Sequence, residues 1–140
     1  MLSFKQLAPD PDEAEGSAKI EILGRLIDTR FCVDDVVWFD FQQLCGGPRS
    51  AFDYVEIARM YHALLLGNVP QMLSGNEDHA RRFISLIDEL YDRNVKLVMA
   101  AAVPLQELYV GSVLAFEFER TRSRLSEMQS HEYLSREHKP

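Results

Sequence analysis

Cysteine is scarce in this chain, and no metal-binding pattern surrounds the two that occur. Cys32 and Cys45 are the only thiols among 140 residues, and neither has a second Cys or a His at zinc-site spacing. A reducing compartment fits such a chain, with both thiols buried as small apolar groups. No run of 18 apolar residues occurs, so we expect no transmembrane helix. The first residues lack the apolar core of a signal peptide.

Positive charge is also in short supply. Lys and Arg number 15 against 22 Asp and Glu, which gives a net charge of −7 and a pI of about 5.0. Nucleic-acid binders carry a basic footprint, so this balance argues against that class of protein. Hydrophobic residues make up 46% of the chain, which is enough for a sizeable core, and the length favours a single domain.

The motifs of nucleotide hydrolysis are missing as well. The phosphate-binding pattern G-x-x-x-x-G-K-[ST] does not occur, and "CGGPRSA" reads as a turn and helix cap. Asp88-Glu89 follows no apolar strand and is expected on a solvated helix face, so it is no magnesium site. No metal spacing or Ser-His-Asp set joins the four histidines, His62, His79, His131 and His138. We therefore expect no catalytic residue, metal or cofactor in this chain alone.

The N-terminal part is expected to contain a linker and a β-hairpin. Residues 1–18 hold two prolines and a cluster of acids, which predicts a flexible linker before one domain at 19–140. Apolar residues then alternate with others from Ile20 to Leu26 and from Val37 to Phe41, the period of strands. Gly24 suggests a bulge or bend, and Val33-Asp34-Asp35 the hairpin turn.

A βαβ unit is the strongest pattern in the middle of the chain. Ala63–Leu66 reads as a buried strand, and Val95–Ala102 as another that turns at Pro104 into a short helix. The helix between them has one apolar face, formed by Ala80, Phe83, Ile84, Ile87, Leu90 and Tyr91. A right-handed crossover would make the two strands parallel neighbours. The fold class is therefore α/β, with a small, mostly parallel sheet, flanking helices and an N-terminal β-hairpin.

Further elements flank this unit. Ser50 and Asp53 resemble a capping box at the start of a helix. Phe116 and Phe118 alternate as in a short strand, and a charged helix is expected from about Arg120 to Arg136.

Arg81 and Arg82 are candidates for a role in trans. An arginine can reach the phosphate of a nucleotide that a neighbouring subunit binds. Spacing alone favours a charged helix face instead, with Arg82 near Glu89 and Arg81 near Asp88.

A second basic group lies near the C-terminus. Arg120, Arg122 and Arg124 could meet an anionic partner or a phosphate. Intrahelical pairing is the preferred interpretation, because three acids lie close by: Glu117, Glu119 and Glu127.

Asn68 is the one polar side chain at the end of a predicted central strand. It could orient a water or a phosphate, although a turn-forming Asn is commoner there. A small α/β enzyme with a site near Asn68 and Ala102 is one possible class of protein. Against it stands the lack of any nucleophile, base or metal set in this region.

Three long segments resemble the C-terminal part of the ZapE/AFG-like family of AAA-type P-loop ATPases. They are residues 41–72 ("FQQLCGGPRSAFDYVEIARMYHALLLGNVPQM"), 80–109 ("ARRFISLIDELYDRNVKLVMAAAVPLQELY") and 116–134 ("FEFERTRSRLSEMQSHEYL"). The resemblance covers roughly residues 19–138. In that family the nucleotide-binding loop and the magnesium-binding strand lie in the N-terminal half, and nothing in this sequence matches that half.

The resemblance implies ATP-dependent remodelling by a homo-oligomer, with ATP and Mg²⁺ bound by the full-length protein. It implies a cytoplasmic bacterial protein at the division site, peripheral to the inner membrane, with division-machinery or membrane-protein clients. It also implies that Arg81 or Arg82, together with Arg120 and Arg124, face a neighbouring subunit or the ATPase core. The family reads Ser-Ala-Glu-Val-Pro where this chain has residues 100–104, Ala-Ala-Ala-Val-Pro, which argues against a sensing role here.

The leading hypothesis is therefore a C-terminal portion of such an ATPase, without Walker A and Walker B motifs, that serves assembly or coupling. The alternative is a stand-alone, non-catalytic protein-interaction module.

Overall fold

The computed structural model describes residues 18–140 and has the α/β fold that the sequence predicts. The linker expected at residues 1–18 lies outside the described range, apart from Ala18, where the first strand begins. The strands are β1 (Ala18–Ile22), β2 (Arg25–Thr29), β3 (Phe31–Val33), β4 (Val36–Asp40), β5 (Ala63–Val69) and β6 (Lys96–Ala101). The helices are α2 (Phe41–Cys45), α3 (Ala51–Met60), α4 (Glu77–Asp92), the 3₁₀ helix η1 (Leu105–Glu107), α5 (Ala115–Glu127) and α6 (His131–Leu134).

The N-terminal part forms two β-hairpins, where the sequence predicted one. β1 pairs antiparallel with β2, and their turn is Leu23-Gly24, with φ values of 51° and 81°. Gly24 is therefore a hairpin-turn residue and not a bulge, because a two-residue turn of this hand needs positive φ at both positions. β3 pairs antiparallel with β4, and Asp34 and Asp35 form their turn, as predicted.

The central sheet has the order β3-β4-β5-β6, with β4, β5 and β6 parallel and β3 antiparallel at one edge. The predicted βαβ unit is confirmed, since β5 and β6 are parallel neighbours joined through α4. β5 continues beyond its predicted end at Leu66 to Val69. The register shifts between these two residues, where Asn68 has a φ of 54°.

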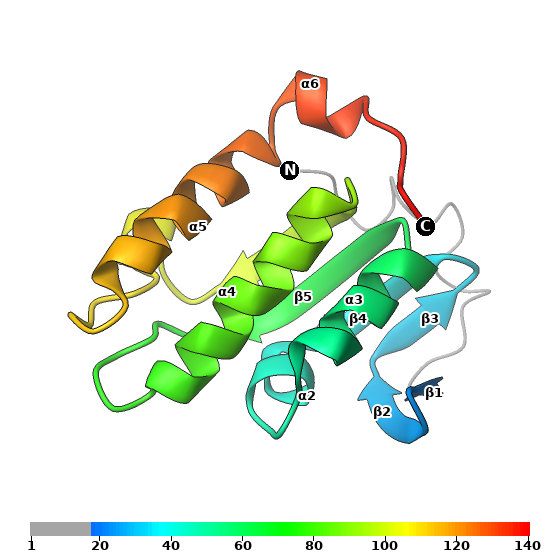
Figure 1. The fold of residues 1–140 in the computed structure, drawn as a ribbon, viewed down its shortest axis with the longest axis horizontal. Coiled ribbons are helices and arrows are strands. Elements are labelled where there is room, and N and C mark those ends of the chain that lie inside the picture. The colour runs from blue at the N-terminus through cyan, green and yellow to red at the C-terminus, as the bar shows by residue number, and fades with distance from the viewer. Residues whose placement is uncertain (1–17) are drawn as a thin grey trace.

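The helices α2, α3 and α4 lie on one face of the sheet, and α5 lies beside α4 (Figure 1). Two successive crossovers in the same direction, β4 to β5 and β5 to β6, explain this arrangement. A right-handed crossover places its helix on a fixed side, so both crossover helices cover the same face.

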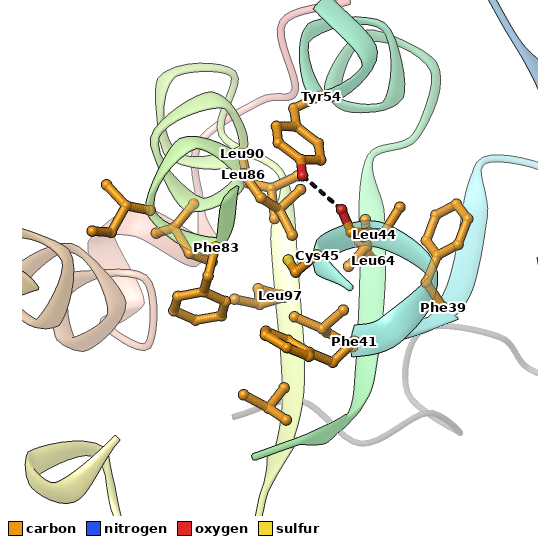
Figure 2. Close-up of a cluster of buried hydrophobic side chains, with 14 of the residues drawn as sticks. Phe39, Phe41, Leu44, Cys45, Tyr54, Leu64, Phe83, Leu86, Leu90 and Leu97 are labelled. Carbon is orange, nitrogen blue, oxygen red and sulfur yellow. Dashed lines mark hydrogen bonds between the residues drawn. The ribbon is translucent and has the colours of Figure 1, made fainter. Parts of the chain in front are cut away.

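The main core fills the space between this face and the helices. Figure 2 shows apolar side chains from strands and helices converging there: Phe39, Phe41, Leu44, Cys45, Tyr54, Leu64, Phe83, Leu86, Leu90 and Leu97. The Tyr54 hydroxyl is inside this core and donates a hydrogen bond of 2.6 Å to the carbonyl of Leu44. This bond satisfies a buried polar group and ties α3 to the end of α2.

The opposite face of the sheet carries a smaller apolar cluster, to which the described helices contribute no residue. Trp38 belongs to this cluster, whereas its neighbour Phe39 faces the main core, as the alternation predicted. The Trp38 side chain lies against Gly67 of the neighbouring strand β5. A Cβ on Gly67 would lie 3.0 Å from the indole Nε1 of Trp38, so a larger residue is disfavoured there.

The C-terminal helices differ from the prediction. Phe116 and Phe118 lie in α5 and not in a strand. Residues at spacings of three and four are buried along this segment, namely Leu114, Phe118, Thr121, Leu125 and Met128, which is the helical period. The charged helix ends at Glu127, and Ser130 begins α6 by accepting a hydrogen bond of 3.1 Å from the Tyr133 amide.

Two loops meet at the carboxyl ends of β5 and β6. The amide of Met72 donates to the carbonyl of Leu108 at 2.7 Å, and the amide of Val110 donates to the carbonyl of Met72 at 3.0 Å. This bridge forms just after η1, the short helix expected to follow Pro104. The loops that follow the two strands are therefore joined to each other.

Candidate functional site

Asp88 of α4 is the point at which two predicted site residues meet. Arg124 Nη1 binds one of its carboxylate oxygens, and Arg120 Nη2 lies 3.4 Å from the other. The Arg124 guanidinium also lies over the Tyr91 ring, 4.9 Å from its centroid. The Asp88 and Arg124 side chains are each 25% exposed. Arg120 and Arg124 thus hold α5 against α4.

The expected intrahelical pairing is only partly correct. Arg122 Nη1 lies 2.5 Å from Glu119 Oε1 within α5, but Arg120 and Arg124 pair across to α4. Asp88 is correspondingly not on a solvated face. Spacing along one helix could not show this, because the partner lies 36 residues before Arg124 in the sequence.

Arg82 points toward the end of α2. Its Nη1 donates a hydrogen bond of 3.3 Å to the carbonyl of Cys45, and its side chain is half-buried. Burial raises the pKa of the neighbouring Cys45 thiol to about 12. The expected ion pair of Arg82 with Glu89 does not form between these described residues.

Arg81 differs from the other three candidates. Its side chain is exposed, and it forms no ion pair or hydrogen bond with any residue in the range 18–140; its expected partner Asp88 is engaged by α5 instead. Arg81 lines a hollow of about 220 Å³ between α4 and the start of α5, together with Ile84, Ser85, Asp88, Leu114 and Glu117. Within residues 18–140, its guanidinium is therefore unpaired.

Asn68 lies at the carboxyl ends of the strands, as expected, but its amide is engaged. Its Nδ2 donates to Asp40 Oδ1 at 3.0 Å, and Arg30 Nη1 lies 3.1 Å from Asp40 Oδ2. A hollow of about 330 Å³ next to it is lined by residues 68–70 and 100–102. The structure brings Asn68 together with Asp40 and Arg30, but not with the four arginine candidates.

The sequence did not predict two polar contacts, that of Asp40 with Asn68 and Arg30 and that of Arg25 with Asp53. Asp40 is the last residue of β4, and an acid at the carboxyl end of a buried strand is a signal for a strand-end site that the sequence prediction did not use. The pair formed by Arg25 and Asp53 was also missed. Its partners lie 28 residues apart, so no local pattern indicates it.

No set of three or more His, Cys, Asp or Glu in the described part of the chain is placed to hold a metal ion. Among residues 18–140, every helix is too short or too polar to span a bilayer.

The fold is that of an α/β domain in which Arg82, Arg120 and Arg124 join helices and Arg81 faces outward from α4. The chain belongs to the AFG1-like ATPase family, whose sequence profile matches residues 1–137. It is 48% identical over 124 residues to cell division protein ZapE of Escherichia coli (strain K12), covering 89% of this chain and 33% of that protein. It is 30% identical to lactation elevated protein 1 homolog B of Danio rerio, covering 93% of this chain and 32% of that protein.

A further relative, uncharacterized protein C115.02c of Schizosaccharomyces pombe (strain 972), is 41% identical over 91 residues, covering 65% of this chain and 20% of that protein. The chain thus spans about a third of the length of the first two of these relatives. No solved structure matches it significantly.

Proposed function

We propose that this chain serves as the C-terminal part of an AFG1-like ATPase and contributes assembly or coupling rather than hydrolysis. The observation that carries the proposal is the family match over residues 1–137, in a chain that aligns with only 33% of ZapE. ATP and Mg²⁺ would be bound by an N-terminal ATPase half, which supplies the Walker motifs that this sequence lacks.

The ZapE relationship supports a role in bacterial cell division for the complete protein. We propose that it acts in the cytoplasm, peripheral to the inner membrane, on division-machinery or membrane-protein clients. Its immediate partners would be the ATPase half and like subunits of a homo-oligomer. The net charge of −7 supports proteins rather than nucleic acids as partners.

Arg81 is the arginine best placed to face such a partner. Arg120 and Arg124 are occupied by Asp88, and Arg82 is directed toward the carbonyl of Cys45 at the end of α2. In our proposal Arg120 and Arg124 hold α5 against α4, while Arg81 reaches a neighbouring subunit or the ATPase core.

Exposed apolar residues before and at the start of α5, where Leu114 and Glu117 share a hollow with Arg81, support a protein-binding face. Phe116 is 88% exposed, Val113 61% and Val110 51%. Contiguous exposed apolar patches mark interaction sites, and these three residues lie within seven positions of one another in the sequence. A stand-alone, non-catalytic interaction module would use the same face, and this observation keeps it as the second candidate.

The test of Arg81 is ATP hydrolysis by a full-length ATPase that contains this domain. Arg81→Ala should lower the rate at least about tenfold if the guanidinium stabilises charge on a neighbour's phosphate. Arg59→Ala is the matched control, because Arg59 is an exposed arginine of α3 whose ion-pair partner is Glu56. Equal rates in the two variants would contradict the role of Arg81.

Two measurements separate the candidate functions. An in-frame P-loop half in the DNA upstream of Met1 would support the ATPase part, and its absence would support the stand-alone module. ATP titration of the 140-residue chain should show no micromolar affinity. Micromolar binding would contradict the non-hydrolysing role proposed for this chain.

A further inference from the structure

A second group of arginines gathers around the loop between α2 and α3. Arg49 Nε donates to the carbonyl of Gln43 at 3.0 Å, and Arg82 Nη1 to the carbonyl of Cys45 at 3.3 Å. Arg25 Nη1 donates to the carbonyl of Pro48 at 3.4 Å. Arg25 of β2 and Arg82 of α4 thus reach the segment 43–53, to which Arg49 itself belongs. We call Arg25, Arg49 and Arg82 the arginine cluster.

Within residues 18–140, the arginine cluster holds more positive charge than the neighbouring carboxylates neutralise. One buried carboxylate, Asp53, faces it and is bound by Arg25 Nη2 at 2.5 Å. Asp78 lies one turn before Arg82 on α4, but it is exposed and no ion pair joins these two described residues. Among residues 18–140, two guanidinium charges therefore remain without a carboxylate partner.

The hydrogen bonds to carbonyls hold the guanidinium groups without using up their donors. A guanidinium has five N–H donors, whereas Arg49 and Arg82 each spend one on a carbonyl within the described chain. The loop itself is open at Gly47, since no described atom lies within 4 Å of the point where a Cβ would stand. The hydrogen bonds to carbonyls fix the side chains of the cluster, and the loop is open at Gly47.

The position of the cluster in the fold is also typical of a ligand site. α2 starts directly after the carboxyl end of β4, and α4, which carries Arg82, follows the carboxyl end of β5. Ligands of α/β sheets bind outside the carboxyl ends of the strands. Figure 1 shows α2 and the beginning of α4 at the same end of the molecule.

We propose that the arginine cluster binds a phosphate group. A phosphate monoester carries about −1.5 to −2 charges at pH 7, which matches the two guanidinium groups that have no carboxylate partner among residues 18–140. Guanidinium forks also fit phosphate oxygens with two parallel hydrogen bonds. The Asp53 carboxylate does not oppose this, because it is 1% exposed and already paired with Arg25. The site uses residues other than Arg81 and does not depend on the proposed function.

The test is a titration of the 140-residue chain with pyrophosphate at constant ionic strength. Binding is monitored through the NMR signals of the Gly47 amide and the arginine Nε–H groups. We expect saturable shifts confined to the cluster, with a dissociation constant on the order of 1 mM. Arg49→Gln and Arg82→Gln should each weaken binding about tenfold, since each removes a charge-assisted hydrogen bond. Both variants leave the pair of Arg25 and Asp53 in place.

Arg59→Gln is the control, because it removes the same charge from α3 and should change the affinity less than about twofold. Arg49→Lys, which keeps the charge but not the fork, should bind with intermediate affinity. Shifts that fail to saturate, or that are the same in Arg49→Gln and Arg82→Gln as in the parent chain, would overturn the proposal. A titration with ATP distinguishes the sources of phosphate. If ATP binds with the same affinity as pyrophosphate, the site recognises phosphate alone. If ATP binds more tightly and both Arg49→Gln and Arg82→Gln weaken its binding, the site recognises a nucleotide.

Discussion

Arg25 Nη2 lies 2.5 Å from both carboxylate oxygens of Asp53 and so joins the β1–β2 hairpin to the first turn of α3. The Asp53 side chain is 1% exposed and that of Arg25 47%. Burial raises the pKa of Asp53, but hydrogen bonds from the Ser50 amide and from Arg25 outweigh this effect and leave the pKa below its ordinary value.

Asp53→Asn should therefore destabilise the fold by about 2 kcal/mol at pH 7 in urea unfolding. The value is below that of a fully buried pair, because solvent screens Arg25. Asp28→Asn is the control, since Asp28 and Lys19 are both exposed and 3.8 Å apart; it should cost less than about 0.5 kcal/mol. Equal losses in the two variants would contradict a special role for the buried carboxylate.

The same pair predicts a pH dependence of stability. Because the folded-state pKa of Asp53 is lowered, its contribution is present above the unfolded-state pKa of about 3.9 and disappears as the pH falls through the folded-state value. The free energy of unfolding should thus fall more steeply below about pH 4 in the parent chain than in Asp53→Asn. Parallel pH profiles would count against this assignment.

Asp88→Asn should loosen the contact between α4 and α5. Arg120 and Arg124 would lose their shared carboxylate, at a cost of about 1 kcal/mol given their partial exposure. Asp92→Asn, an exposed change on the same helix, should be nearly neutral. In a double-mutant cycle, Asp88→Asn and Arg124→Gln should be non-additive; additive losses would mean that the two groups do not interact.

Gly67→Ala should disturb the second face of the sheet. The added Cβ would lie 3.0 Å from Trp38 Nε1 and 3.3 Å from Asp40 Oδ1, and we expect a loss of about 1–3 kcal/mol. Trp38 is the only tryptophan, so its fluorescence reports the change directly. Gly47→Ala, which meets no described atom within 4 Å, should leave both stability and emission unchanged.

The two cysteines should differ in reactivity. Cys45 is fully buried with a pKa of about 12, so little thiolate exists at pH 8 and a disulfide reagent should reach it only on unfolding. Cys32 is half-buried, with its sulfur 3.8 Å from the Tyr61 hydroxyl, and should react in the native state. Cys32→Ser should abolish this native reaction; fast labelling that persists in the variant would place Cys45 in a more open environment.

The elements that could be predicted are those with a long local pattern. The apolar face from Ala80 to Tyr91 predicts α4 correctly, and the apolar runs on either side predict two parallel strands. Phe116 and Phe118 misled the prediction, because two aromatics two residues apart fit a strand as well as a helix. Only packing separates the cases: Phe118 stacks on Phe83 at 6.0 Å, while Phe116 is exposed.

The candidate site was less predictable than the fold. All four arginines were identifiable as charged positions, but their partners were not, because Asp88 and the carbonyl of Cys45 come from distant parts of the chain. The roles of Arg81, Arg82, Arg120, Arg124 and Asn68 in function remain predictions.

The backbone bridge between Met72 and Val110 ties together the loops that follow β5 and β6. Amide protons on both sides of it can exchange with solvent only when both loops open, so Met72 and Val110 should form one cooperative unit in native-state hydrogen exchange. A ligand that orders either loop would slow exchange in the other, 38 residues away in sequence. The bridge thereby makes two separate connections behave as a single thermodynamic element at the carboxyl ends of β5 and β6.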